Sequence, residues 1–504
     1  MDSARRPVRQ PSAILLLVLP PLLLLLLAGP HPALARASCP SGRLIEPCTC
    51  KTKSKANCAP HLGGDGTPLT CLDIVCEAAN ADTLHKVMDH IKGVPNSAIQ
   101  YMKIRDCDLS RLPDYFFMSL SIKHLYIIRS HLSVVENNAL SSLAESLETL
   151  DFSSNNIKTI PDQAFRRLKK VDALYLNGNQ IEEIPARAFA GLANMSRLSL
   201  YYNKISKVDD DAFYGLPNLH TLNMVQNHLR SVPAQAIKPL TRLVALDLSM
   251  NNITEIKKND FSGLHTLDSL KLEHNQIKQL PPGAFSELQE LTTLKMESNQ
   301  ITYIDEKAFE GLEQSLEWLS LGNNRVFAIP KQALRGLHRL KELDLKNNNI
   351  SIIPEDAFEA YGQTLKFLRL QHNHIKDIPQ GTFLQMHSLE WLQLSHNQIT
   401  TLPLETVESM LNTLEVIDLY ENPLICNCDM VWFKEWITNH SEKEEFQSLH
   451  HDPHCRKYDS RHIVSVKKLP RSEFNCPTGG QPPAAAASCW LQLLLLTGSA
   501  AARQ

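Results

Sequence analysis

Residues 243–253 read Leu-Val-Ala-Leu-Asp-Leu-Ser-Met-Asn-Asn-Ile, and the frame inside this stretch decides the fold. Leu243, Leu246 and Leu248 lead to Asn251 and Ile253, in the order Leu-x-x-Leu-x-Leu-x-x-Asn-x-Ile/Leu. The asparagine returns every 24 or 25 residues, at Asn155, Asn179, Asn203, Asn227, Asn251, Asn275, Asn299, Asn324, Asn348, Asn373, Asn397 and Asn422. A fixed period of this length predicts a stack of similar units, each packed only on its neighbours.

Each part of the frame has a physical role. Alternate leucines of Leu-x-Leu point to one side of a short strand, so the strand buries them and exposes the residues between. An asparagine at a buried turn has two N–H donors and an acceptor oxygen for the backbone of its own unit and of its neighbours. The second half of each unit reads Ile-Pro-x-x-Ala-Phe-x-x-Leu. Its large residue is predicted to form an apolar spine on the convex side, at Phe165, Phe189, Phe213, Phe261, Phe285, Phe309, Phe358 and Phe383, with Ile237, Leu334 and Val407 elsewhere.

This frame resembles the leucine-rich repeat. Two degenerate units extend the array toward the N-terminus, with Ser130 and Cys107 at the asparagine position, where cysteine is an accepted alternative. The resemblance implies an α/β solenoid, a horseshoe of about fourteen rungs with a parallel sheet on the concave side and disulfide-bonded caps at both ends. Cys107 should then be a buried thiol.

Ten of the twelve cysteines divide between the two ends of the repeats, six before them and four after them. The motif Asn422-Pro423-x-x-Cys426-x-Cys428 is similar to the C-terminal cap of extracellular leucine-rich repeat proteins such as Slit, the Toll ectodomains and connectin. That resemblance implies the pairs Cys426–Cys455 and Cys428–Cys476. The N-terminal region also resembles arthropod secreted repeat proteins, including the non-catalytic subunit of shrimp luciferase. Its six cysteines allow fifteen pairings, of which we expect Cys39–Cys50, Cys48–Cys71 and Cys58–Cys76.

The expected organisation places a cysteine-rich cap at 36–83, the repeats at 84–425 and a second cap at 426–476. Helical spacing of apolar residues predicts a short capping helix at 84–92.

Both ends of the chain carry features of a secreted or anchored protein. Arginines, an apolar run and Ala33-Leu34-Ala35 are typical of a signal peptide, which we expect to span residues 1–35. Residues 477–504 combine small residues, a spacer and a short apolar run, as a glycosylphosphatidylinositol (GPI) anchor signal does, with Gly479 as the attachment residue. Gln492 interrupts that run, so plain secretion and a membrane-spanning helix remain alternatives.

The concave surface is where repeat proteins bind partners. Within five successive rungs, its outward positions gather aromatic residues and an arginine, the residue types that dominate interface hot spots. We predict a partner-binding patch made of Trp318, Phe367, Arg369, Trp391, Gln393 and Tyr420. The alternative is cross-strand packing that only stiffens the sheet.

Two further surface features bear on partners. Four sequons predict N-glycosylation at Asn194, Asn252, Asn349 and Asn439, and glycans mark surface outside a tight interface. A basic cluster in the C-terminal cap raises heparan sulfate as a ligand, with a solvated surface as the alternative; it comprises Arg456, Lys457, Arg461, Lys467, Lys468 and Arg471.

The sequence argues against several function classes. No His-Glu-x-x-His, Gly-x-Ser-x-Gly or phosphate-binding glycine loop occurs, so we expect no enzyme and no cofactor. No set of ligands with metal-site spacing occurs either, and a net charge of −3 gives no electrostatic basis for nucleic-acid binding. The resemblance implies an extracellular protein-binding module in cell adhesion, guidance or receptor and co-receptor signalling. Innate immune pattern recognition and a role as a structural matrix component or non-catalytic subunit are alternatives.

Overall fold

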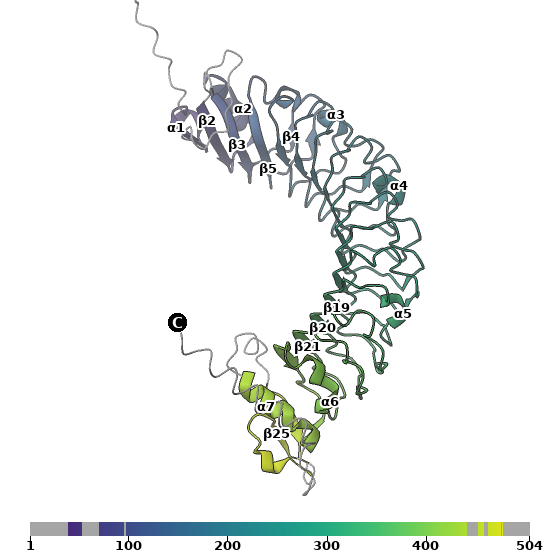
Figure 1. Cartoon of the computed structure of the whole chain (residues 1–504). Coiled ribbons are helices and arrows are strands. Elements are labelled where there is room, and N and C mark those ends of the chain that lie inside the picture. The colour runs from purple at the N-terminus through teal and green to yellow at the C-terminus, as the bar shows by residue number, and fades with distance from the viewer. Residues whose placement is uncertain are drawn as a thin grey trace, which may run out of the picture.

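The computed structural model describes residues 39–52, 70–94, 97–440, 452–457, 462–474 and 476. One curved sheet of sixteen strands forms the inner side of a horseshoe (Figure 1). β1 pairs antiparallel with β2, and the later neighbours that follow along the sheet are parallel. In sheet order the strands are β1 (Cys48–Thr52), β2 (Thr70–Glu77), β3 (Ser97–Arg105), β5 (Ile122–Ile128), β7 (Thr149–Asp151), β8 (Ala173–Tyr175), β10 (Arg197–Ser199), β12 (Thr221–Asn223), β13 (Ala245–Asp247), β14 (Ser269–Lys271), β16 (Thr293–Lys295), β18 (Trp318–Ser320), β19 (Glu342–Asp344), β20 (Phe367–Arg369), β21 (Trp391–Gln393) and β22 (Val416–Asp418).

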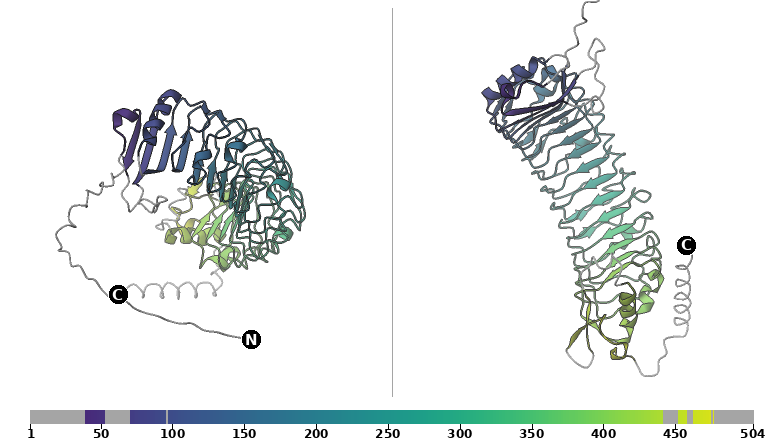
Figure 2. Two further views of the ribbon diagram at one scale, coloured as in Figure 1. Left: turned by 90° about the horizontal axis from the view of Figure 1, so that it is seen from above. Right: turned by 90° about the vertical axis from the view of Figure 1, so that its left-hand side faces the viewer.

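The fourteen strands from β3 onward each belong to one rung, which confirms the predicted number. The strands lie side by side like the rungs of a ladder across the concave face (Figure 2). Short helices and small two-stranded pairs cover the convex side. They are η2 (Ser141–Leu143), α3 (Asp162–Phe165), α4 (Ala234–Ile237), α5 (Lys331–Leu334), α6 (Leu404–Val407) and η3 (Glu408–Met410), with the pairs β4 (Arg111–Leu112) and β6 (Val134–Val135), β9 (Glu183–Ile184) and β11 (Lys207–Val208), and β15 (Gln279–Leu280) and β17 (Tyr303–Ile304).

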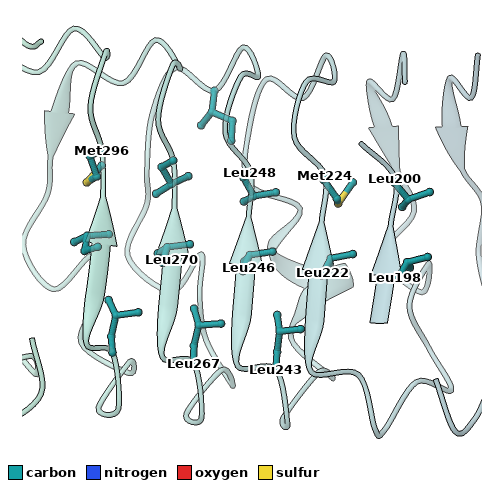
Figure 3. Close-up of a cluster of buried hydrophobic side chains, with 14 of the residues drawn as sticks. Leu198, Leu200, Leu222, Met224, Leu243, Leu246, Leu248, Leu267, Leu270 and Met296 are labelled. Atoms are coloured by element: carbon teal, nitrogen blue, oxygen red, sulfur yellow. The ribbon is translucent and has the colours of Figure 1, made fainter. Parts of the chain in front are cut away.

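The inward leucines form continuous rows between the two sides of the solenoid (Figure 3). Leu246 and Leu270 lie in register on neighbouring strands. Leu243 and Leu267 lie three residues earlier and form a second row. All of them are buried. The rows explain why these positions hold large apolar residues, including Met224, Met296 and Phe152, since every rung must fill the same space against the next.

The predicted spine is buried on the convex side, and it accounts for the curvature. Neighbouring rings lie 6.0 Å apart between Phe189 and Phe213, and 6.2 Å apart between Phe285 and Phe309. Paired strands on the concave side are only about 4.8 Å apart. Because each rung is wider at the spine than at the sheet, stacking rungs bends the solenoid toward the sheet.

The frame asparagines are buried and form a hydrogen-bonded ladder. The Asn251 side-chain amide donates to the carbonyls of Met224, at 2.9 Å, and Leu248, at 3.1 Å. Its side-chain oxygen accepts from the Leu229 amide at 3.0 Å. At the first degenerate positions, the Ser130 hydroxyl accepts from the Cys107 amide at 3.3 Å, and Cys107 is a buried free thiol, as expected.

The N-terminal cap consists of α1 (Gly42–Ile45), β1, β2 and α2. Helix α2 spans Ala81–Lys92 and begins three residues before the expected range, because the Asn80 side chain caps it by accepting from the Thr83 amide at 2.9 Å. Four apolar residues of α2 are buried against the first rungs. They are Leu84, Val87, Met88 and Ile91.

The N-terminal disulfides agree only in part with the prediction. Cys39 is bonded to Cys50, as expected, but Cys48 is bonded to Cys76, so the pairs Cys48–Cys71 and Cys58–Cys76 are wrong. The antiparallel register of β1 and β2 sets Cys48 directly opposite Cys76, with 4.0 Å between their Cα atoms. Cys71 lies five residues back along β2, about 17 Å away at strand rise, which is too far for a disulfide. Cys71 is itself disulfide-bonded, and Cys58 lies outside the described residues.

The C-terminal cap closes the last rung. It comprises β23 (Leu424–Ile425), η4 (Cys428–Met430), α7 (Val431–His440), β24 (His454–Arg456), β25 (Ile463–Ser465) and η5 (Arg471–Glu473). The disulfides Cys426–Cys455 and Cys428–Cys476 are present, as the resemblance implied. The Trp432 indole N–H donates to the Leu402 carbonyl at 2.7 Å, which ties α7 to the last repeats. Within the described ranges, none of the helices has the length and apolar character needed to span a bilayer.

Candidate protein-binding surface

The concave sheet brings three of the predicted residues into one aromatic row. The register aligns Trp318 of β18 with Glu342 of β19, and then with Phe367 of β20 and Trp391 of β21. The ring centroids of Trp318 and Phe367 lie 6.3 Å apart, and those of Phe367 and Trp391 lie 6.2 Å apart. Trp318 is 37 % exposed, and the other two rings are half-buried. The row therefore packs across strands and still presents apolar surface to solvent.

An ion-pair cluster lies beside the aromatic row. Arg369 pairs with Glu342, which lies between the Trp318 and Phe367 rings in the register. Lys346 bridges Glu297, at 3.3 Å, and Asp344, at 3.0 Å. These ion pairs hold the charged side chains against the sheet. The aromatic rings next to them stay partly exposed to solvent.

The electrostatics of this cluster follow from burial and pairing. Burial opposes ionisation of Glu297, but the Ser320 hydroxyl and the Lys346 ammonium outweigh it and lower the pKa of Glu297. Asp344 is more deeply buried, and there desolvation prevails over Lys346 and raises the pKa of Asp344. Two carboxylates that share one ammonium thus differ in pKa because one keeps more contact with solvent.

Of the other predicted residues, Gln393 lies beside the aromatic row and Tyr420 lies apart from it. Gln393 lies next to Arg369 in the register, and its side-chain oxygen accepts from the side-chain amide of Gln371 at 3.3 Å. Tyr420 lies away from the row, against His396, with ring centroids 5.8 Å apart. His396 stacks on His372 at 4.1 Å. The patch therefore consists of an aromatic row with Arg369 and Gln393, and of a separate cluster that contains Tyr420.

The sequence prediction missed the histidine stack and a second aromatic group near the N-terminus. His372 and His396 hold the same frame position in successive rungs, directly before the ladder asparagine, and this spacing was the available signal. On the N-terminal rungs, Tyr101 stacks on His124 at 4.8 Å, and Lys103 lies 5.3 Å from the Tyr126 ring centroid. These two rungs lack the ladder asparagine that marks the regular frame, although the strand register sets His124 and Tyr126 opposite Thr149 and Asp151 of the first regular rung.

The four sequon asparagines are all exposed. Asn252 borders an open hollow of about 770 Å³, which is lined by residues that follow the frame asparagines in neighbouring rungs. The other lining residues are polar, namely Ser206, His228, Arg230, Thr254 and Gln276. A glycan at Asn252 would stand at the rim of this hollow and hinder access to it, so the hollow is a poor site for a separate ligand.

The basic cluster of the C-terminal cap is partly neutralised. Lys457 pairs with Glu473, and Arg471 pairs with Glu435 at 3.0 Å. Both pairs lower the net positive charge that an anionic polysaccharide would meet. Arg461 lies outside the described residues. Among the residues that the structure places, no group of three or more His, Cys, Asp or Glu side chains is arranged to hold a metal ion.

Comparison with known proteins gives the fold and its relatives. A family model described as leucine rich repeat matches residues 121–361 in five overlapping segments and residues 363–424 in a sixth. No curated protein matches the sequence. The TLR13–ssRNA13 complex is similar at 22 % identity with a TM-score of 0.56, over 77 % of this chain and 62 % of that one. The Toll–Spatzle complex of Drosophila is similar at 20 % identity with a TM-score of 0.57, over 76 % of this chain and 56 % of that one.

A bacterial protein shares the same architecture. LIC12759 of Leptospira interrogans is 27 % identical with a TM-score of 0.53, over 68 % of this chain and 83 % of that one. The chain thus spans less than two thirds of the TLR13 and Toll chains. At these identities the matches to TLR13 and Toll show the fold alone.

Proposed function

Because this chain belongs to the leucine-rich repeat family, we propose that it is an extracellular recognition module that binds a protein partner through the C-terminal half of its concave face. The observation that carries the proposal is the aromatic row Trp318–Phe367–Trp391, which stays partly exposed on a rigid sheet. Aromatic side chains that are already ordered lose little conformational entropy on binding. Such residues are the usual centre of an interface hot spot.

The surroundings of the row support a protein partner. Arg369 and Gln393 border the rings with groups that can donate and accept hydrogen bonds, and the ion pair of Arg369 with Glu342 holds the guanidinium in place. An apolar centre with a polar margin is the common anatomy of a protein interface. Two of the similar structures are complexes, one with Spatzle and one with a single-stranded RNA. The concave charges here are largely paired, which favours a protein over a nucleic acid.

Adhesion, guidance and co-receptor signalling remain the roles that we propose for this binding, with display on the outer cell surface or release into the medium. Disulfides at both ends support an oxidising, extracellular setting. Heparan sulfate remains a secondary proposal, because the ion pairs of Lys457 and Arg471 weaken the basic cluster.

The test is a binding screen with matched variants. The full chain, tagged after the signal peptide and expressed in secretory cells, is presented to an array of purified extracellular protein domains. We expect Trp318→Ala with Trp391→Ala to weaken a bound partner by about 2 kcal/mol or more, roughly 30-fold. Tyr303→Ala with Phe327→Ala removes comparable exposed rings outside the concave strands and should leave binding unchanged. Equal affinity of the tryptophan variant and the wild type would remove the proposed site.

A further inference from the structure

Two apolar side chains on one edge of the solenoid are exposed in neighbouring rungs. Phe327 is 66 % exposed and Ile352 is 69 % exposed, the two largest values among the bulky apolar residues that the structure describes in the repeats. Neither lies on a concave strand. Ala328 and Ile352 form a parallel bridge, so Phe327 lies opposite Ser351. Neighbouring exposed apolar side chains can form a surface that binds an occupant or promotes aggregation.

A predicted glycosylation site lies directly beside these residues. In the sequon Asn349-Ile350-Ser351, Ile350 is buried, whereas Asn349 and Ser351 are exposed. The backbone N–H of Asn349 donates to the Val326 carbonyl at 2.9 Å, which places Asn349 against the rung that carries Phe327. One rung and two residues separate Asn349 from Phe327, roughly 8 Å from strand spacing and rise. The asparagine side chain and one sugar ring can bridge that separation.

We propose that the N-linked glycan of Asn349 folds back on Phe327 and Ile352, so that its core N-acetylglucosamine covers this apolar patch. A pyranose ring has a face of C–H groups that packs on an aromatic ring while its hydroxyls remain in water. The glycan then removes apolar surface from solvent without burying polar groups unpaired. This inference rests on the proposed extracellular location, because the sugar is added in the secretory pathway.

The chain contains a matched site without the apolar patch. Asn252 holds the same frame position as Asn349, and its backbone N–H donates to the Leu229 carbonyl at 2.9 Å. Arg230 and Glu255 take the positions of Phe327 and Ile352 there. The two sequons therefore share backbone geometry and differ in the side chains next to the sugar. A difference between the two sites in the rate of enzymatic glycan release would therefore be due to those side chains.

The test uses the full chain, purified from secretory cells with its glycans intact. Peptide mass spectrometry first determines the occupancy of Asn194, Asn252, Asn349 and Asn439. The folded glycoprotein is then treated with peptide-N-glycosidase F, which converts each released asparagine to aspartate, so the rate at each site can be read separately. We expect the Asn349 glycan to be released several-fold more slowly than the Asn252 glycan, and the two rates to converge after denaturation.

Variants assign the protection to the patch. Phe327→Ser, which installs the residue found at this position in the next rung, should speed release at Asn349 several-fold and leave Asn252 unchanged. Phe327→Tyr keeps the ring and should keep the slow rate. Tyr303→Ser alters an exposed ring two rungs from Ile352 and should change neither site.

Each other outcome counts against a specific claim. Equal release rates at Asn349 in the wild type and Phe327→Ser overturn the proposed contact. A bare Asn349 beside an occupied Asn252 also overturns it, while the extracellular location stands. Four bare sequons on a chain retained inside the cell would overturn both the contact and the proposed location.

Discussion

The buried asparagine side chain is the residue on which the stacking of rungs depends. At Asn275, the amide donates to the Leu248 carbonyl at 3.0 Å and the Leu272 carbonyl at 3.1 Å, and the oxygen accepts from the Ile253 amide at 3.0 Å. These backbone groups belong to the same rung and to its neighbour, so one side chain joins both. Buried backbone groups that lose their partner are costly.

We predict that Asn275→Ala destabilises the repeats by about 3 kcal/mol or more, since an unmade buried hydrogen bond costs roughly 1–3 kcal/mol. Guanidinium unfolding measures the loss. Gln276→Ala changes the adjacent side chain, which is partly exposed, and should stay within about 0.5 kcal/mol of the wild type. Similar midpoints for the two variants would show that the ladder contributes little.

The histidine stack predicts a dependence on pH at the level of one residue. Desolvation and the neighbouring His396 lower the pKa of His372, against a weaker opposite effect of Asp418. A folded-state pKa below the ordinary 6.5 means that the folded protein favours neutral His372. This contribution to stability is present above pH 6.5 and is lost as the pH falls below it.

Histidine-selective NMR can follow this titration. We expect His372 to titrate below its ordinary pKa in the wild type, and closer to it in His396→Gln, because the variant removes the neighbouring imidazole. His374→Gln alters a histidine outside the stack and serves as the control. An unchanged His372 titration in His396→Gln would contradict the coupling.

At the scale of elements, the caps protect the ends of the core. Helix α7 covers the last repeats through Trp432, and Cys426–Cys455 joins the start of the cap to β24. An open solenoid end exposes a row of leucines that its missing neighbour would otherwise bury. The cap therefore acts mainly on the rungs next to it.

We predict that Cys426→Ser with Cys455→Ser weakens the C-terminal cap by about 3–4 kcal/mol, from the loss of a closed loop with a sequence separation of 29 residues. Hydrogen exchange should rise in α7 and β22 and remain unchanged near β8, because each rung contacts only its neighbours. Cys107→Ser removes the free thiol and is the control for losing a cysteine without losing a bond. Uniform exchange changes along the whole solenoid would argue against local action of the cap.

At the scale of the whole molecule, curvature concentrates the outward strand residues on one concave surface (Figures 1 and 2). The exposed sequon residues Asn252 and Asn349 directly follow the frame asparagines Asn251 and Asn348, outside the concave strands. The proposed partner would therefore meet a concave face free of the sugars predicted at these two sites. Under the proposed extracellular location, the mode of attachment decides whether the protein meets its proposed partner on a cell or in solution.

We predict display on the outer cell surface through a lipid anchor at Gly479, which lies outside the described residues. Cells that express a chain tagged after residue 38 are treated with phosphatidylinositol-specific phospholipase C. Release of the tag into the medium is expected, and Gly479→Trp should reduce surface display because an attachment site requires small residues. Tagged protein that enters the medium without the lipase would instead indicate plain secretion.

The sequence by itself determined the solenoid, the number of rungs and the buried ladder. Those features repeat a local frame, so each position is assigned by its neighbours in the chain and checked in many rungs. Only the tertiary structure decided the pairing of Cys48 with Cys76, because the register of β1 on β2 joins segments separated by residues that carry no frame. It also decided which outward residues meet, separating Tyr420 from the aromatic row and joining it to His396. Contacts between rungs depend on side-chain direction and curvature, which a one-dimensional period does not contain.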